Sequence, residues 1–170
     1  DLNAIEQNLK AIKSVVGSDT KILAIVKADA YGHGAVKVSQ SLEQNGIDML
    51  GVAFPGEGIE LRKNNTNIPI LILNPVLSEQ IEDVVKHSLR VTVNSLDIAN
   101  EISITAKRYH HTVRIHVEID TGMGGAGVCL DKALPFIKAL LLIENLEIEG
   151  VFTHFNSSDE KDKSFTYEQN

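Results

Sequence analysis

A lysine that follows a short apolar segment is the residue with the clearest chemical potential in this sequence. Residues Ile22 to Val26 are apolar and predict a buried strand, and Lys27 comes directly after them. The carboxyl ends of strands carry the active sites of α/β folds. A lysine held there is partly withdrawn from water, which favours a neutral amine that can form a Schiff base with a carbonyl compound. On position alone, a lysine whose charged end simply reaches solvent is the commoner case.

The segment after Lys27 has the composition of a phosphate-binding loop. Ala28-Asp29-Ala30-Tyr31-Gly32-His33-Gly34 offers a phenol that can hydrogen-bond a phosphate and two glycines that allow close approach of the backbone. A helical pattern over residues 35–45 follows, and the N-terminus of a helix attracts anions. A glycine loop of this kind is not specific by itself.

A second set of polar residues lies further along the chain. Val113, Ile115, Val117 and Ile119 alternate with Arg114, His116, Glu118 and Asp120, so one face of this predicted strand is polar. Strands of a parallel sheet are normally apolar on both faces, so the pattern indicates either a hydrated interior site or an edge strand. The loop 121–127 that follows contains four glycines. His154, at the end of the next predicted strand, is a further candidate, although a lone histidine beside aromatic residues more often packs than reacts.

Other ionisable residues indicate no separate site. His87, His110 and His111 show no spacing typical of metal ligands, so we predict no metal. Glu57 and Glu60 lie on a predicted helix, where a solvent-facing role is the default.

Six strand–loop–helix units are expected to position these residues. Asn3 and Glu6 have the spacing of a capping box for a helix that Gly17 ends. The predicted strands lie near residues 22–26, 49–53, 70–73, 89–93, 113–119 and 148–152, and Ser78, Ser95 and Asp131 are plausible caps of the helices between them. Because no hairpin turn joins the strands, the sheet should be parallel. The pattern fits an open doubly wound sheet or part of a (β/α)8 barrel, and the pattern alone favours the open sheet because an incomplete barrel makes a poor core.

Composition narrows the class of partner. The 170 residues include 16 Lys and Arg against 23 Asp and Glu, a formal net charge of −7, so no broad basic surface exists for nucleic acid. The single cysteine, Cys129, cannot form an intrachain disulfide, which favours the cytoplasm over secretion. The longest apolar run covers residues 139–143 and is far shorter than the ~20 residues that cross a bilayer. No membrane partner is expected.

The motifs together resemble the N-terminal barrel domain of the alanine racemase family. Val26-Lys27-Ala28-Asp29-Ala30-Tyr31-Gly32-His33-Gly34 is similar to the family signature V-K-A-N-A-Y-G-H-G, with Asp29 in place of the usual asparagine. Asp120-Thr121-Gly122-Met123-Gly124 is similar to the family's D-T-G-M-G loop, and Thr153-His154-Phe155 to its T-H-F. The resemblance covers residues 1–170 and implies an incomplete (β/α)8 TIM-type barrel of about six units, without the family's C-terminal β domain.

The resemblance also implies a cofactor and a reaction. Lys27 would hold pyridoxal 5′-phosphate covalently and act as one of the two racemisation bases, Tyr31 would hydrogen-bond the phosphate, and His154 would lie against the cofactor ring. In this family the second base is a tyrosine of the partner subunit's C-terminal domain, so the resemblance implies a homodimer and predicts that the 170-residue chain alone does not racemise alanine. The intact protein would interconvert L-alanine and D-alanine and supply D-alanine for bacterial peptidoglycan.

One departure from the family lies inside the expected site. Members commonly carry an arginine after D-T-G-M-G that contacts the substrate carboxylate, and here that position is Gly125. Glu118 stands where several members have a carbamylated lysine, and its carboxylate can replace the carbamate's charge. We expect His116 or Arg114, on the same polar face, to take part of the missing arginine's role.

Three rival functions follow. The absence of arginine at Gly125 leaves open a racemase of another small amino acid. A non-catalytic, single-domain pyridoxal phosphate carrier has a similar barrel, but the D-T-G-M-G and Y-G-H-G motifs argue against it. Decarboxylation of basic amino acids by the same fold is weaker still, because these motifs are the racemase versions.

Overall fold

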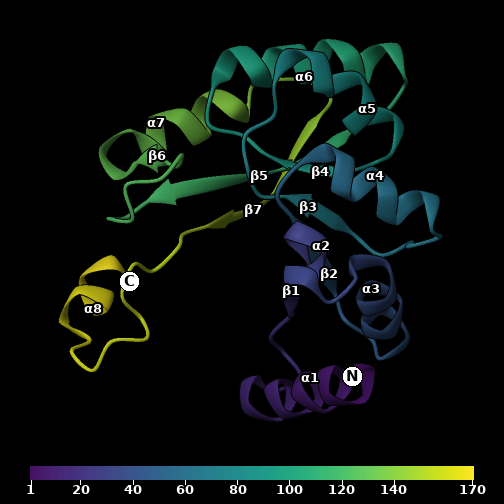
Figure 1. Ribbon diagram of the computed structural model, residues 1–170. Coiled ribbons are helices and arrows are strands. Elements are labelled where there is room, and N and C mark those ends of the chain that lie inside the picture. The colour runs from purple at the N-terminus through teal and green to yellow at the C-terminus, as the bar shows by residue number, and fades with distance from the viewer.

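The computed structural model describes residues 1–170 as strands that alternate with helices (Figure 1). The strands are β1 (Leu23–Ile25), β2 (Met49–Val52), β3 (Ile70–Ile72), β4 (Arg90–Thr92), β5 (Val113–Asp120), β6 (Val128–Cys129) and β7 (Leu146–Phe152). The helices are α1 (Leu2–Val16), α2 (Lys27–Gly32), α3 (Ala35–Gln44), α4 (Pro55–Lys63), α5 (Ile81–Lys86), α6 (Leu96–Arg108), α7 (Leu130–Leu140) and α8 (Ser164–Gln169), with a 3₁₀ turn, η1, at Ser78–Gln80.

The sheet is parallel throughout and its strands follow chain order. The order is β1-β2-β3-β4-β5, β7 pairs with β5, and the short β6 pairs with the last two residues of β5. A doubly wound sheet reverses its strand order at a switch point, whereas a barrel winds in one direction. The incomplete barrel is therefore confirmed, and the preference of the pattern alone for an open doubly wound sheet is wrong.

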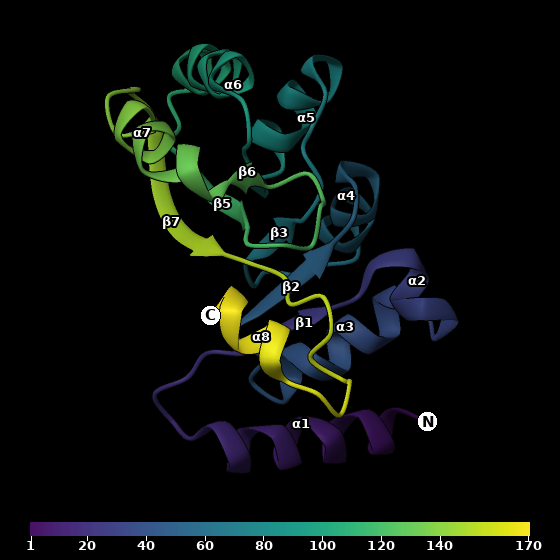
Figure 2. The same ribbon diagram turned by 90° about the vertical axis from the view of Figure 1, so that its left-hand side faces the viewer.

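The barrel is not closed. β1 pairs only with β2 and β7 pairs only with β5, so each presents a free edge. Helices α3 to α7 form an arc outside the strands, and the inner side of the sheet carries no such layer (Figure 2). Ile25 and Val151 on the two edge strands are 37% and 53% exposed.

The core lies between the strands and the arc of helices. Val113, Ile115 and Val117 of β5 are buried on the outer face of the sheet, toward the helices. Ile102 of α6 and Leu140 of α7 are buried on the helix side of the same core. Each fully buried side chain of this size contributes about 1.5–3 kcal/mol of hydrophobic stabilisation. β5 is a central strand, so its polar residues face the barrel interior and the edge-strand alternative is wrong.

Several predicted helix starts need correction. The capping box at Asn3 and Glu6 does not form, because α1 starts at Leu2 and the Asp1 carboxylate accepts the Asn3 N–H at 2.9 Å. Ser95 caps α6 as predicted, accepting the Asp97 N–H. The other two proposed caps are wrong: Ser78 lies inside η1, and Asp131 lies in the first turn of α7, after its start.

Candidate functional site

Lys27 lies at the carboxyl end of β1, as the sequence predicts. The Val26 N–H donates to the Gly51 carbonyl at 2.8 Å, which continues the pairing of β1 with β2 up to the lysine. The half-buried Lys27 side chain lines a cavity of about 480 Å³ together with Tyr31, His116 and His154. The structure thus brings together three predicted cofactor residues from two motifs far apart in the sequence.

The backbone after Lys27 forms a left-handed turn. Ala28, Asp29, Ala30 and Tyr31 have φ of 51–55° and ψ of 37–51°. The left-handed helical conformation costs an L-residue about 1–2 kcal/mol, and none of these four is a glycine. The sequence places its two turn glycines at Gly32 and Gly34, which do have positive φ of 84° and 90°, but the structure extends the positive φ upstream to Ala28.

Hydrogen bonds within the segment close this turn. The Ala30 N–H donates to the Val26 carbonyl at 3.0 Å, and the Gly34 N–H donates to the Asp29 carbonyl at 2.9 Å. The Asp29 carboxylate accepts the Ala35 N–H at 2.7 Å, at the start of α3. This carboxylate therefore takes an amide at the helix start that sequence reasoning assigned to a bound anion.

A hydrogen bond from a different helix also reaches the turn. Glu57 of α4 accepts the Ala28 N–H through Oε1 at 2.7 Å, and its Oε2 accepts the Ala53 N–H at 2.6 Å and the Phe54 N–H at 3.1 Å. The solvent-facing role expected of Glu57 is wrong. A usable signal was Pro55 at the start of the helix, which places Glu57 in the first turn, where carboxylates meet unpaired amides.

The glycine-rich loop after β5 is shaped by Asp120, the last residue of the strand, and by its own last residue, Gly127. The Asp120 carboxylate accepts the Gly124 and Gly122 N–H groups at 3.0 and 2.9 Å, and these bonds lower the pKa of Asp120. A Cβ on Gly127 would lie 2.8 Å from the Asp120 nitrogen, so the return of the chain into β6 requires glycine there. Gly125, by contrast, has open space around its Cα and no left-handed φ.

Glu118 and His154 lie near one another at the carboxyl ends of β5 and β7. Burial raises the pKa of the Glu118 carboxyl; the nearby His154 opposes this rise and Asp120 adds to it. His154 itself is exposed and lines the cavity with Lys27.

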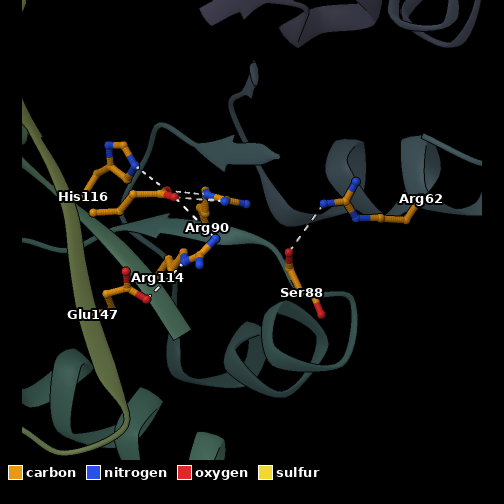
Figure 3. Close-up of polar contacts among 7 residues, drawn as sticks. Arg62, Ser88, Arg90, Arg114, His116 and Glu147 are labelled. Carbon is orange, nitrogen blue, oxygen red and sulfur yellow. Dashed lines mark hydrogen bonds and ion pairs between the residues drawn. The ribbon is translucent and has the colours of Figure 1, made fainter. Parts of the chain in front are cut away.

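His116 and Arg114 belong to an ion-pair network on the inner face of the sheet (Figure 3). Glu149 of β7 pairs with Arg90 and accepts from His116 Nε2 at 3.1 Å. Glu149 occupies a register shift of β7, where Ile115 and His116 face residues two apart. Gly150 gives the His116 ring its room, since a Cβ there would lie 2.7 Å from Nδ1.

Arg114 lies toward the opposite end of the sheet from Lys27. Its Nε donates to Glu147 at 3.1 Å, and both residues line a second cavity rather than the one that contains Lys27. Of the two residues expected to replace the missing arginine, only His116 lines the cavity with the lysine. Nothing in the sequence spacing indicated that Glu147 and Glu149 would pair with Arg114 and His116.

Helix α8 joins the two strand ends that carry Asp120 and His154. The buried Gln169 donates to the Thr121 hydroxyl and to the His154 carbonyl, each at 3.4 Å, and accepts the Asn156 N–H at 2.9 Å. Thr121 and Thr153 are hydrogen-bonded through their hydroxyls at 2.8 Å. No sequence motif marks Gln169, because its partners are more than ten residues away in the chain.

No group of three or more His, Cys, Asp or Glu side chains is placed to hold a metal ion. None of the helices combines the length and apolar content that crossing a lipid bilayer requires.

The chain is similar over its whole length to known alanine racemases. The family model described as "Alanine racemase, N-terminal domain" matches residues 1–170. The alanine racemase of Halothermothrix orenii is 42% identical over 169 residues, which are 99% of this chain and 45% of that protein. That of Methanococcus maripaludis is 40% identical over 98% of this chain and 45% of the relative. The chain thus spans less than half the length of these relatives.

Solved structures give the same result. The alanine racemase of Clostridium difficile in complex with cycloserine superposes with a TM-score of 0.94 at 42% identity, over 97% of this chain and 46% of that one. The Bacillus anthracis alanine racemase with bound L-Ala-P superposes with a TM-score of 0.90 at 35% identity, over 99% of this chain and 44% of that one. A histidine racemase of Leuconostoc mesenteroides, at 20% identity, shares the fold with a TM-score of 0.89.

The match of the family model to all 170 residues agrees with the barrel topology and with the lysine at the end of its first strand. This chain belongs to the alanine racemase family, whose members are pyridoxal phosphate enzymes, and corresponds to part of that family's N-terminal domain.

Proposed function

We propose that the intact protein containing this chain interconverts L-alanine and D-alanine with pyridoxal phosphate held at Lys27. The observation that carries the proposal is the cavity that Lys27 shares with Tyr31 and His154 at the carboxyl end of the strands. Residues 1–170 form the partial N-terminal barrel domain. A supply of D-alanine for peptidoglycan and a location in the cytoplasm belong to the same proposal.

The residues of the cavity fit the cofactor. Its volume of about 480 Å³ is within the range of small-molecule sites. Lys27 supplies an amine for an aldehyde, the Tyr31 phenol is 62% exposed and can donate to a phosphate, and Leu71 and Leu73 supply an apolar wall. When bound, pyridoxal phosphate supplies an electron sink that stabilises the carbanion left after loss of the substrate's α-proton.

The chain's own residues would hold the cofactor in place and move a proton. Tyr31 is expected to fix the phosphate and His154 to bound one side of the site. The Lys27 Nζ would take or give a proton on one face of the substrate's α-carbon. Racemisation requires a second base on the opposite face, which the family resemblance assigns to a tyrosine of the partner subunit. We therefore propose a homodimer, and we expect the 170-residue chain alone to be inactive.

A direct test is reduction with borohydride in the presence of pyridoxal phosphate, followed by mass spectrometry. A stoichiometric adduct on Lys27, lost in Lys27→Ala, is the expected result in the full-length protein. Lys37, exposed on α3, provides a matched control, because Lys37→Ala should leave the adduct intact. Labelling scattered over several lysines would refute the assignment of Lys27.

The second candidate is a racemase of another small amino acid, and the observation that favours it is Gly125 in place of the carboxylate-binding arginine. The structure offers no guanidinium on the cavity wall, because Arg114 is engaged at the other end of β5. Rates measured with a panel of small amino acids separate the two candidates. Alanine should turn over fastest, and a faster rate with another member of the panel would favour the second candidate.

A further inference from the structure

The Glu57 carboxylate joins three backbone amides from two parts of the chain. One oxygen accepts the Ala28 N–H, directly after Lys27, and the other accepts the Ala53 and Phe54 N–H groups, which follow β2. Both oxygens of the half-buried side chain are therefore used. The distance of 2.7 Å to the Ala28 nitrogen is short for an N–H donor, as expected when the acceptor is a carboxylate.

This contact ties an amide of the left-handed turn to α4. The turn's other connections run to its neighbours: the Val26 N–H donates to Gly51 of β2, and the Asp29 carboxylate accepts the Ala35 N–H of α3. The bonds that Ala30 N–H and Gly34 N–H donate stay within the segment 26–34, and so stabilise its shape without fixing its position. Glu57 lies 29 residues beyond Ala28 in the sequence and on a helix of the outer layer. Four consecutive non-glycine residues with positive φ persist only where surrounding structure holds them.

We propose that Glu57 is a positioning residue for Lys27 and Tyr31. The Ala28 N–H belongs to the peptide group that follows Lys27, so a fixed amide there fixes the direction in which the lysine leaves the backbone. Tyr31 closes the same turn three residues later, so the carboxylate that fixes the position of the turn also places the phenol on the cavity wall. This inference rests on the proposed function, since it concerns how the lysine is presented to the cofactor.

Glu57→Gln is the informative variant. Glutamine has nearly the same size but only one acceptor oxygen, and its NH₂ group would face an N–H donor on one of the two sides. Glu60→Gln is the matched control, because Glu60 lies one turn further along α4, is exposed, and its carboxylate accepts no hydrogen bond. Glu57→Asp keeps both acceptor oxygens on a shorter stem, and so tests rescue by the conservative residue.

Two measurements on the full-length protein test the proposal. Amide hydrogen exchange without cofactor reports whether the segment 27–34 is held. We expect faster exchange there in Glu57→Gln, while β4 exchanges as in the wild type. Titration with pyridoxal phosphate, followed by the circular dichroism of the bound cofactor, reports its affinity and fixed orientation. We expect binding about tenfold weaker, the loss typical of one hydrogen bond to a charged acceptor, and a reduced dichroic signal. Glu57→Asp should lie between Glu57→Gln and the wild type in both measurements.

The outcomes are distinguishable. Wild-type affinity and dichroism in Glu57→Gln, or equal losses in Glu57→Gln and Glu60→Gln, would overturn the positioning role. If Glu57→Gln does not fold, Glu57→Asp decides: unchanged exchange of segment 27–34 together with unchanged dichroism would overturn the proposal. Failure of the wild-type protein to attach the cofactor at Lys27 would instead overturn the proposed function, and the exchange measurement would still show whether Glu57 holds the turn.

Discussion

Restoring arginine at position 125 tests whether the glycine there limits binding of the substrate carboxylate. The backbone accepts the change, because Gly125 has no left-handed φ and a Cβ would meet no heavy atom within 4 Å. The loop is exposed, and a substitution without a steric clash on an exposed loop changes the free energy of unfolding by less than about 0.5 kcal/mol. Gly125→Arg should therefore fold like the wild type.

The expected gain lies in the KM for alanine. A hydrogen bond to a charged group contributes about 1.5–3 kcal/mol, and solvent competition at an exposed loop favours the lower end of that range. The lower end corresponds to a KM about tenfold lower, because each 1.36 kcal/mol is a factor of ten in affinity. Added salt should reduce the gain, since salt screens exposed charges.

Steady-state kinetics in both directions on the full-length protein, with melting temperatures as a check on folding, are the assay. Ala126→Arg is the matched control, because it adds the same charge one residue further along the same exposed loop. We expect the KM to fall in Gly125→Arg and to stay constant in Ala126→Arg. An unchanged KM in a well-folded Gly125→Arg protein, or an equal fall in both variants, would refute the idea that position 125 faces the substrate.

Three further predictions concern carboxylates near the site, and thermal unfolding tests all of them, as a function of pH for Glu118 and Glu149. Burial raises the pKa of Glu118, so ionisation weakens the fold: Glu118→Gln should melt higher at neutral pH, and the difference should vanish below about pH 4, where both states bind the proton. Hydrogen bonding from Arg90 lowers the pKa of Glu149, so the stabilisation that the Glu149 carboxylate provides is present above the ordinary carboxyl pKa and is lost in acid. Glu149→Gln should lower the free energy of unfolding by about 1.5–3 kcal/mol at neutral pH, and an equal loss in acid would contradict this. Asp29→Ala should cost about 1 kcal/mol by removing the acceptor at the start of α3, whereas Asp29→Asn, the family's usual residue, should stay within about 0.5 kcal/mol; equal losses would show that the charge and not the acceptor matters.

The order of strands and helices could be predicted because local composition determines it. Apolar runs such as Ile22–Val26 and the alternation over 113–119 locate strands that the structure confirms at Leu23–Ile25 and Val113–Asp120. The choice between an open sheet and a barrel was beyond the pattern, because both use the same alternating units. Strand order resolves it, and strand order is a property of contacts between units.

Helix starts were predicted less well for a related reason. A capping residue is defined by the backbone that it meets, and several side chains can compete for the same amides. The cap of α1 is Asp1, two residues before the predicted cap, and it accepts the Asn3 N–H, while Glu6 accepts from the Ser41 hydroxyl at 3.1 Å. Spacing identified the helix but not the residue that begins it.

The candidate site, too, could be predicted from the sequence only in part. Lys27, Tyr31 and His154 follow strand ends, and strand ends of a parallel sheet meet at one edge, so their shared cavity follows from the sequence pattern. The left-handed turn at 28–31 does not, because alanine and tyrosine rarely adopt positive φ and the single aspartate does not predict a run of four such residues.

The residues that sequence reasoning missed share one property: each acts on a segment far from it in the chain. Glu57 holds the amide of Ala28, Gln169 joins the loop after β5 to the end of β7, and Glu149 engages Arg90 and His116 of two other strands. A motif records which side chains can do chemistry, whereas the geometry of that chemistry depends on such cross-connections. A left-handed turn of ordinary residues is intrinsically unfavourable, so the position of Lys27 depends on the neighbours that hold the turn. Substitutions at Glu57 should for this reason weaken the site even where every residue of the V-K-A-D-A-Y-G-H-G motif is intact.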